Sequence, residues 1–331
     1  MNSVQNQCFP ICYSSEVRNR PLGVQLFGDP IVLFRNSKGV IQALNDQCPH
    51  RGAPLSKGKV VGDEICCPYH GWTFGEGGKC CSIPGMDSGK TRSIHNVKSY
   101  CVKEQYGLVW VGSENCDSIP VIPELANSKY VSFNLDINVE VGLLQVIENV
   151  LDPMHTHYVH DGWIRSNSER SGQKVVISTQ SNSIEVKYVT QDQQDGFIYK
   201  LLTLGRTVVE SYGRFISPNT TQIEYKTDKN DHFLINGFIS PINENHTRLF
   251  LVSTCKTKLP FSLMKCVVKK LFNTALLQDQ KILTTVSKHK QKFKNNQKEV
   301  STYLDMVGPL ANQLLKGNSL TQKTKEILIY V

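Results

Sequence analysis

Two short stretches of the sequence each pair a cysteine with a histidine: Cys48 with His50, and Cys67 with His70. Thiolate and imidazole ligands together bind zinc or an iron–sulfur cluster. One cysteine and one histidine on each of two loops can place both cysteines on one iron and both histidines on the other. The spacing therefore predicts a [2Fe–2S] cluster with mixed ligands, and a zinc site is the alternative.

The residues around these pairs favour tight loops in a small all-β domain. Gly52 and Gly71 let the chain turn close to a metal, and a proline follows each cysteine. Four apolar, β-branched or aromatic segments separated by turn residues are typical of short strands, and they cover residues 24–36, 39–46, 99–105 and 107–112. A proline-rich linker follows at residues 117–124. We expect one domain over residues 1–115 and a second over residues 116–331.

A second group of possible metal ligands follows the linker: Asp152, His155, His157 and His160. A single histidine would be explained by packing, but three beside an aspartate point to a metal, since imidazole is the commonest metal ligand. The apolar residues of segment 139–151 have helical spacing, and the proline after Asp152 interrupts this helix. The interruption lets His155 and His160 converge, although a separation of five residues does not align them on a regular helix.

A carboxylate far along the chain lies in an apolar setting. Residues 261–290 predict one long helix, and Asp279 falls within its apolar stripe. The stripe consists of Met264, Val268, Leu271, Phe272, Ala275, Leu276, Ile282, Leu283 and Val286. A buried carboxylate without a partner is costly. A metal ion is one possible partner of Asp279, and a buried arginine or lysine is the alternative.

With both groups present, the sequence resembles the Rieske proteins and, over nearly its whole length, the catalytic alpha subunits of α3-type Rieske non-haem iron oxygenases. The match rests on the two Cys–His pairs, the D-x2-H-x4-H pattern and the later helix with its Gln-Asp pair. It implies an α+β fold, in which an all-β Rieske domain precedes a helix-grip catalytic domain, a curved antiparallel sheet around a long helix. Suitable strands occupy residues 173–180, 183–191, 197–204, 207–216, 221–228, 233–242 and 247–255.

The resemblance also implies a role for each site residue. The cluster ligands would be Cys48, His50, Cys67 and His70, and the ligands of a mononuclear Fe(II) would be His155, His160 and Asp279. Asp152 matches an acid that connects a cluster histidine of one subunit to an iron-ligand histidine of the next, and capping of a short helix is the alternative role. Asn149 matches a polar residue near the iron, whereas His157 is not at a ligand position.

The resemblance implies partners and a reaction as well. The sequence contains no G-x-G-x-x-G opening a βαβ unit, so electrons from NAD(P)H would come through a separate flavin- or ferredoxin-type reductase. The subunits would form a homotrimer. The expected reaction is O2-dependent hydroxylation of a C–H bond, and residues 147–163 resemble saxitoxin-pathway hydroxylases, which suggests a guanidinium alkaloid as substrate. Oxidative O- or N-demethylation of an aromatic is the alternative reaction. A Rieske electron-transfer protein and a helix-grip carrier of small molecules are the non-enzymatic alternatives.

Composition and charge exclude several other classes. The chain has 331 residues, 40% of them apolar, which is enough for two ordinary domains. The net charge of +8 is moderate, and basic residues are not interleaved with aromatic ones as in nucleic-acid-binding proteins. No apolar run reaches about eighteen residues, so no membrane span is expected. The N-terminus lacks the features of a signal peptide, so we expect a cytoplasmic protein whose eleven scattered cysteines stay reduced.

Overall fold

The chain folds into two compact units, Met1–Ile119 and Pro120–Val331. The computed structural model describes residues 7–87, 89–113, 115–117, 119–165, 170–189, 197, 200, 207–230, 232–256, 261–293 (the backbone alone for 261–264) and 299–331. The boundary predicted from the sequence, between residues 115 and 116, lies shortly before this division. The predicted strand at residues 197–204 lies mostly outside the described residues.

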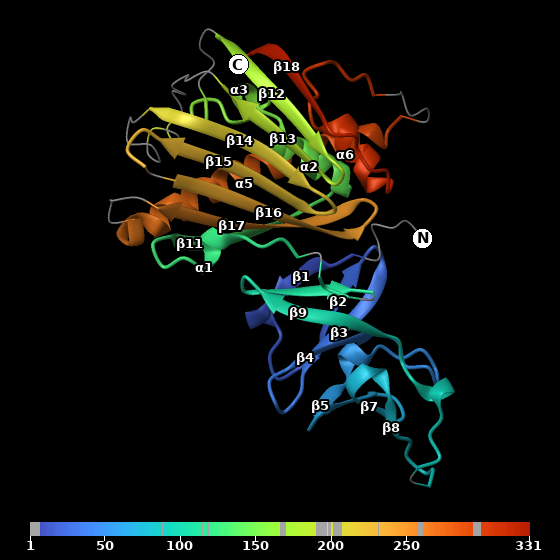
Figure 1. Ribbon diagram of the computed structural model, residues 1–331. Helices are drawn as coiled ribbons and strands as arrows, with labels where there is room; N and C mark the ends of the chain where they lie inside the picture. The colour runs from blue at the N-terminus through green and yellow to red at the C-terminus, as the bar shows by residue number, and fades with distance from the viewer. Residues whose placement is uncertain are drawn as a thin grey trace. The chain divides into compact units, whose positions relative to one another are not determined.

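The first unit is built from two antiparallel sheets of short strands (Figure 1). The larger sheet has the order β1-β10-β9-β4-β3-β2 and the smaller one the order β5-β6-β7-β8. The larger sheet comprises β1 (Phe9–Tyr13), β2 (Leu22–Leu26), β3 (Asp29–Arg35), β4 (Ile41–Asn45), β9 (Ser99–Gln105) and β10 (Leu108–Gly112). The smaller one comprises β5 (Lys59–Val61), β6 (Glu64–Cys66), β7 (Thr73–Phe74) and β8 (Cys80–Ser82). The predicted all-β character of this unit is confirmed.

Two details of the larger sheet differ from the sequence prediction. The segment predicted as one strand over residues 24–36 is a hairpin, because Phe27 and Gly28 both have positive φ angles, 52° and 88°, and reverse the chain. The strand β1 was not predicted, because it contains Pro10, which lacks the N–H needed in a central strand. It is tolerated here because β1 lies at the sheet edge and its register shifts between Pro10 and Cys12.

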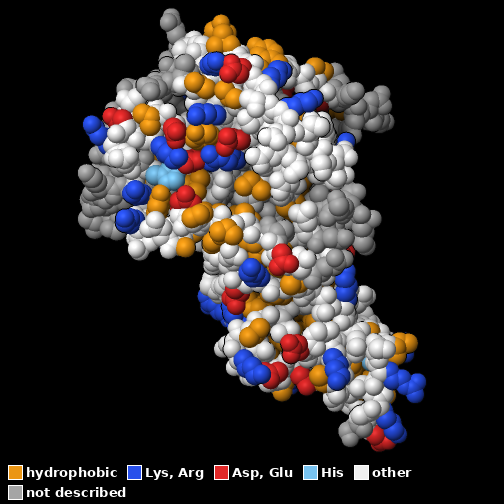
Figure 2. Space-filling model, in the orientation of Figure 1, with side chains coloured by type: hydrophobic (Ala, Val, Ile, Leu, Met, Phe, Trp, Pro, Cys, Tyr) orange, Lys and Arg blue, Asp and Glu red, His pale blue; other side chains and the backbone are white. Residues whose placement is uncertain are grey.

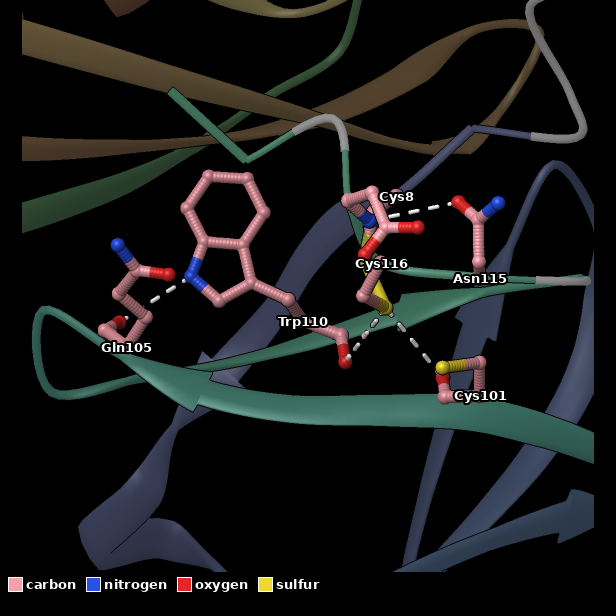
Figure 3. The surroundings of a disulfide bond; sticks show 7 residues. Cys8, Cys101, Gln105, Trp110, Asn115 and Cys116 are labelled. Atoms are coloured by element: carbon pink, nitrogen blue, oxygen red, sulfur yellow. Dashed lines mark hydrogen bonds between the residues drawn. A yellow bond between two sulfur atoms is a disulfide. The ribbon is translucent and has the colours of Figure 1, made fainter. Parts of the chain in front are cut away.

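A disulfide between Cys8 and Cys116 joins the two ends of this unit. Figure 3 shows the bond beside Trp110 and Cys101, whose backbone carbonyls lie 3.8 and 3.7 Å from the Cys116 sulfur. The expectation that all cysteines stay reduced is wrong for this pair. The two cysteines are 108 residues apart in sequence, but β1 pairs with β10 and brings their Cα atoms to 5.1 Å, within the range of a disulfide.

The second unit is an antiparallel eight-stranded sheet with one long helix against it (Figure 1). The strand order is β11-β17-β16-β15-β14-β13-β12-β18. The strands are β11 (Val131–Val139), β12 (Gly172–Gln180), β13 (Ser183–Tyr188), β14 (Val208–Ile216), β15 (Thr220–Thr227), β16 (His232–Asn243), β17 (His246–Lys256) and β18 (Lys323–Tyr330). The helices are α1 (Pro123–Ala126), α2 (Leu143–Leu151), α3 (Thr156–Val159), α5 (Phe261–Lys290) and α6 (Gly308–Leu315). The expected α+β fold is therefore confirmed. No described helix is long and apolar enough to cross a membrane.

The helices of this unit follow the sequence prediction to different degrees. The long helix α5 has both of its predicted ends. The helix predicted over residues 139–151 begins only at Leu143, because β11 reaches Val139 with alternate side chains buried. The apolar stripe of α5 is buried at Val268, Ala275 and Leu276 but not at Ile282 or Val286, which are 39% and 42% exposed. The stripe is therefore covered near its middle and open toward its C-terminal end.

The two faces of the large sheet have different characters. Charged side chains of both signs gather on the face turned toward the viewer in Figure 2. Arg214 pairs with Glu185 and Glu224 at 2.6 and 2.5 Å, and Lys226 pairs with Glu210 at 2.9 Å. Apolar side chains of the sheet share one core with those of α2 and α5. The helices α2 and α5 therefore pack on the apolar face of the sheet.

Candidate metal centres

The two Cys–His pairs of the first unit lie on loops of matching backbone geometry. The Cys48 N–H donates to Ala53 and the Cys67 N–H to Trp72, at 2.9 and 2.8 Å. In each loop the glycine four residues after the cysteine donates back to the cysteine carbonyl. These glycines, Gly52 and Gly71, have φ angles of 73° and 74°, a conformation that other residues rarely adopt. Each loop therefore folds back on its cysteine.

The four predicted ligands of the first centre come together in two layers. Cys48 and Cys67 are buried in the same apolar core. The rings of His50 and His70 lie beside each other with centroids 4.5 Å apart, and the His50 ring stacks on Trp72 at 4.8 Å. The structure thus places the sulfurs inside the domain and the imidazoles side by side, with His70 exposed.

The protonation of these groups fits metal binding. Burial and the neighbouring Cys67 thiol raise the pKa of Cys48 to about 11, so without a metal the thiol stays neutral. Burial, His70 and Arg51 lower the pKa of His50, which favours the neutral imidazole that a metal needs. The Nδ1 atom of His50 is buried without a hydrogen-bond partner. Two buried thiols and an orphaned imidazole nitrogen fit the predicted cluster.

The three predicted ligands of the second centre come from separate elements of the second unit. His155 immediately precedes the short helix α3 and His160 follows it, so one turn of helix brings the two rings to a centroid distance of 5.1 Å. Asp279 reaches them from the middle of α5. One ligand atom from each of the three residues lies within 4.8 Å of the others. Asp279 is more than a hundred residues from His160 in sequence, and the packing of α3 against α5 brings the two together.

The contacts of His160 turn its Nε2 atom toward the Asp279 carboxylate. Its Nδ1 lies 2.8 Å from the Gln278 side-chain oxygen, an acceptor, so Nδ1 carries the hydrogen. In a neutral ring Nε2 then presents a lone pair, and it faces the Asp279 Oδ1 at 3.0 Å. Two lone pairs facing each other at this distance need a proton or a metal ion between them. The donor set of two imidazoles and one carboxylate fits Fe(II).

In the absence of a metal, their surroundings favour the charged forms of the Asp279 carboxylate and the His155 imidazole. Burial opposes ionisation of Asp279, but His155 and His160 outweigh it and lower its pKa to about 2. Burial likewise opposes protonation of His155, but Asp152 and Asp279 raise its pKa to about 9. Asp279 is therefore ready to bind a cation, and a metal ion would displace the proton of His155.

Two further predicted residues lie next to this centre. Asn149 in α2 donates from Nδ2 to the Asp279 Oδ1 at 3.2 Å. Asp152 ends α2 and accepts the backbone N–H groups of Met154 and His155 at 2.7 and 3.2 Å. Its Oδ2 lies 3.5 Å from His155 Nδ1, which is an ion-pair contact without hydrogen-bond geometry. Asp152 thus fixes the backbone that carries His155.

The structure gives Gln278 a role at the site and places His157 outside the ligand group. Gln278, which holds His160, was not assigned a role, although it directly precedes Asp279. His157 is buried outside the ligand group.

A cavity of about 210 Å3 opens beside His155, His160 and Asp279, and its walls are mainly apolar. A small organic molecule in this cavity would lie directly against the ligand group.

Two family models match the chain. The Rieske [2Fe-2S] domain matches residues 7–101, and the vanillate O-demethylase oxygenase C-terminal domain matches residues 139–317. A Rieske domain implies a [2Fe–2S] cluster, and an oxygenase component implies non-haem iron. The second match alone covers more than half of the chain.

Individual relatives agree with these matches. The vanillate O-demethylase oxygenase subunit of a Pseudomonas species is 33% identical over 47% of this chain and 45% of its own length. The dicamba O-demethylase oxygenase component of Stenotrophomonas maltophilia is 33% identical over 48% of each chain. This chain thus spans less than half the length of each of these curated relatives. The crystal structure of dicamba monooxygenase bound to dicamba has a TM-score of 0.83 at 20% identity, over 96% of this chain and 98% of that one, which shows the same fold. With its Rieske domain and its oxygenase C-terminal domain, the chain belongs to the Rieske non-haem iron oxygenases.

Proposed function

We propose that the protein is the oxygenase component of a multicomponent system that uses O2 and electrons from a separate reductase to oxidise a C–H bond of a small molecule. The observation that carries this proposal is the apolar cavity opening onto His155, His160 and Asp279. A Rieske electron carrier needs the first centre alone, and a carrier of small molecules needs the cavity alone. Neither alternative explains a ligand group placed in the wall of a cavity.

The proposed ligands and their neighbours have distinct tasks. Cys48, His50, Cys67 and His70 would hold the Rieske cluster, and His155, His160 and Asp279 would hold the Fe(II). When bound, the two metal centres supply single electrons and open positions for O2. Gln278 keeps the hydrogen of His160 on Nδ1, so that Nε2 can bind. Asn149 donates to Asp279 and fixes the direction of its carboxylate. The apolar walls would exclude water from the bound substrate.

Oxidative demethylation of an aromatic methyl ether is the reaction that we propose. The relatives described above are named O-demethylases of vanillate and dicamba, and the cavity has a size suited to a small molecule. Hydroxylation at the C–H bond of the methyl group would release the methyl carbon as formaldehyde. Neither relative is named for a guanidinium alkaloid, so hydroxylation of such an alkaloid stays a prediction from residues 147–163 alone.

The proposal is tested by a substrate screen with the protein in its metal-loaded form. A surrogate ferredoxin and reductase would supply electrons, and methoxy-, N-methyl- and methyl-free aromatics would be compared. We expect one methoxy aromatic to stimulate O2 uptake and to release formaldehyde in equal amounts. A hydroxylated product without formaldehyde would instead support the hydroxylation prediction. If the cluster can be reduced but no compound stimulates O2 uptake, the result would favour the Rieske electron-transfer protein.

The proposed assembly is a homotrimer, in which Asp152 connects the two kinds of metal centre across a subunit interface. The family resemblance is one support. Another is that Asp152 keeps 37% of its side chain exposed although it contacts His155, so a second partner can reach it. It also lines a second cavity of about 390 Å3.

The variant Asp152→Asn tests this role. Asparagine keeps the size and one acceptor for the backbone N–H groups but loses the charge. We expect iron content and cluster absorbance to survive, while oxidation of the pre-reduced cluster by O2 and substrate slows by about 10- to 100-fold. Single-turnover absorbance kinetics measure this rate.

Asp305→Asn is the matched control, because Asp305 also accepts a backbone N–H, from Thr302. Capping alone predicts that both variants lose thermal stability and keep a normal rate of cluster oxidation. That outcome for Asp152→Asn would refute the connecting role.

A further inference from the structure

One charged side chain in the cavity wall forms no ion pair with any residue that the structure describes. Arg165 lines the cavity next to the proposed iron ligands and is only 9% exposed. Its Nη1 atom is buried without a hydrogen-bond partner. Within the described ranges, no carboxylate forms an ion pair with this guanidinium. The arginine side chain keeps its positive charge at physiological pH, and no described carboxylate balances that charge at Arg165.

The backbone fixes Arg165 relative to the ligand group. The N–H groups of Trp163 and Ile164 donate to the His160 carbonyl at 2.9 and 3.1 Å, so a turn begins at this proposed ligand. The N–H of Gly162 donates to the Arg165 carbonyl at 2.8 Å and closes the turn. Gly162 has a φ of 73°, which favours glycine. Arg165 therefore enters the cavity wall from the same rigid turn as His160.

The carboxylates that line the cavity are engaged elsewhere. Asp152 accepts two backbone N–H groups, Asp279 contacts both ligand histidines, and Glu210 pairs with Lys226 at 2.9 Å. Burying a charge without a partner is costly, and truncated buried pairs lose several kcal/mol. A ligand that brings its own negative charge into the cavity would remove this cost.

The polar neighbours of Arg165 suit an anion as well. Tyr188 and Tyr225 line the same cavity. Burial is the main cause that raises the pKa of Tyr188, and Tyr225 adds to it. Arg165 lowers this pKa but offsets the rise only in part. The Tyr188 phenol therefore keeps its proton and can donate it to an anionic oxygen. One guanidinium and a phenol donor on an otherwise mainly apolar wall form a site for a carboxylate attached to an apolar body.

We infer that Arg165 binds the carboxylate of an aromatic acid and thereby positions the rest of the molecule at the proposed iron site. The inference deepens the proposed function and rests on it for turnover, but not for binding. It also sets the charge of the substrate. The Arg165 charge would repel a cationic guanidinium alkaloid and attract a monoanionic acid.

Binding of three small probes tests the inference on the oxidised, metal-loaded protein. Benzoate, benzamide and benzylammonium share one ring and differ in charge, and titration calorimetry gives the affinity of each. We expect benzoate to bind about 10- to 100-fold more tightly than benzamide, as for a hydrogen bond to a charged group, and benzylammonium to bind most weakly. Arg165→Met should abolish the preference for benzoate, and Arg165→Lys should keep part of it.

Arg170→Met is the matched control, because Arg170 is exposed and contacts only the Tyr158 ring and hydroxyl among the described residues. It should keep the full preference for benzoate. Equal binding of benzoate and benzamide, no binding of benzoate, or an unchanged preference in a folded Arg165→Met protein would each overturn the inference. Charge-selective binding of the probes, together with no stimulated O2 uptake in the screen of methoxy and N-methyl aromatics, would refute the proposed function and leave this inference standing. O2 uptake in that screen without charge-selective binding of the probes would overturn this inference and leave the proposed function standing.

Discussion

Replacing Asp279 by alanine is expected to empty the mononuclear iron site and leave the Rieske cluster intact. Among the described residues, Asp279 is the one carboxylate that contacts both His155 and His160, at 3.4 and 3.0 Å. Without it, only the two imidazole ligands remain and the anionic ligand is lost, so Fe(II) binds poorly. Since changes around metal ligands alone cost 10- to 100-fold, loss of a ligand should lower turnover by at least about 100-fold. Iron analysis should show the loss, and the visible absorbance of the cluster should stay unchanged.

Gln280→Ala is the matched control for this variant. Gln280 is the next residue of α5, and its side chain donates to the Asn138 carbonyl, away from the ligand group. We expect this control to keep both its iron and its turnover. An Asp279→Ala protein that kept full activity would show that the carboxylate has another partner. A loss of cluster absorbance as well as iron would show that the change disturbs the fold.

Local spacing was enough to single out the two Cys–His pairs and the His155–His160 pair as candidate metal ligands, and the family resemblance then implied their roles. In the first unit each ligand pair lies within one loop, so the chain itself sets the distance from Cys48 to His50. The same holds for His155 and His160, which flank one turn of helix. Asp279 was identified by a different signal, a carboxylate within an apolar helical stripe. These predictions needed no knowledge of which elements pack together.

Features that depend on tertiary packing could not be predicted in this way. The Cys8–Cys116 disulfide follows from the pairing of β1 with β10, which brings together residues far apart in sequence. Gln278 has a role only because α5 packs beside α3, and glutamine at such a position is otherwise an ordinary helix residue. Arg165 in sequence is one basic residue among many. Arg165 becomes a candidate ligand-binding residue only through its burial and the absence of a counter-ion within the described residues.

The variant Cys48→Ser is expected to lose the [2Fe–2S] cluster and, with it, all reductase-dependent turnover. Cys48 is buried beside Cys67, and burial raises its pKa to about 11, so the metal must displace the thiol proton to bind. A serine hydroxyl has a still higher pKa and is a harder ligand, which disfavours binding to an iron–sulfur cluster. Acid-labile sulfide and the visible spectrum should both fall to background, while the iron bound by His155, His160 and Asp279 remains.

Cys81→Ser provides the matched control, because Cys81 lies in the same unit but is exposed, with its thiol directed to the Lys79 carbonyl. This control should keep sulfide, absorbance and turnover. The two variants together also separate the cluster from the zinc alternative. A wild-type protein that contains zinc and no acid-labile sulfide, and that loses zinc in Cys48→Ser, would replace the cluster by a structural zinc site. The cavity and the second ligand group would then have no internal source of electrons, and the proposed oxygenase function would fail with it.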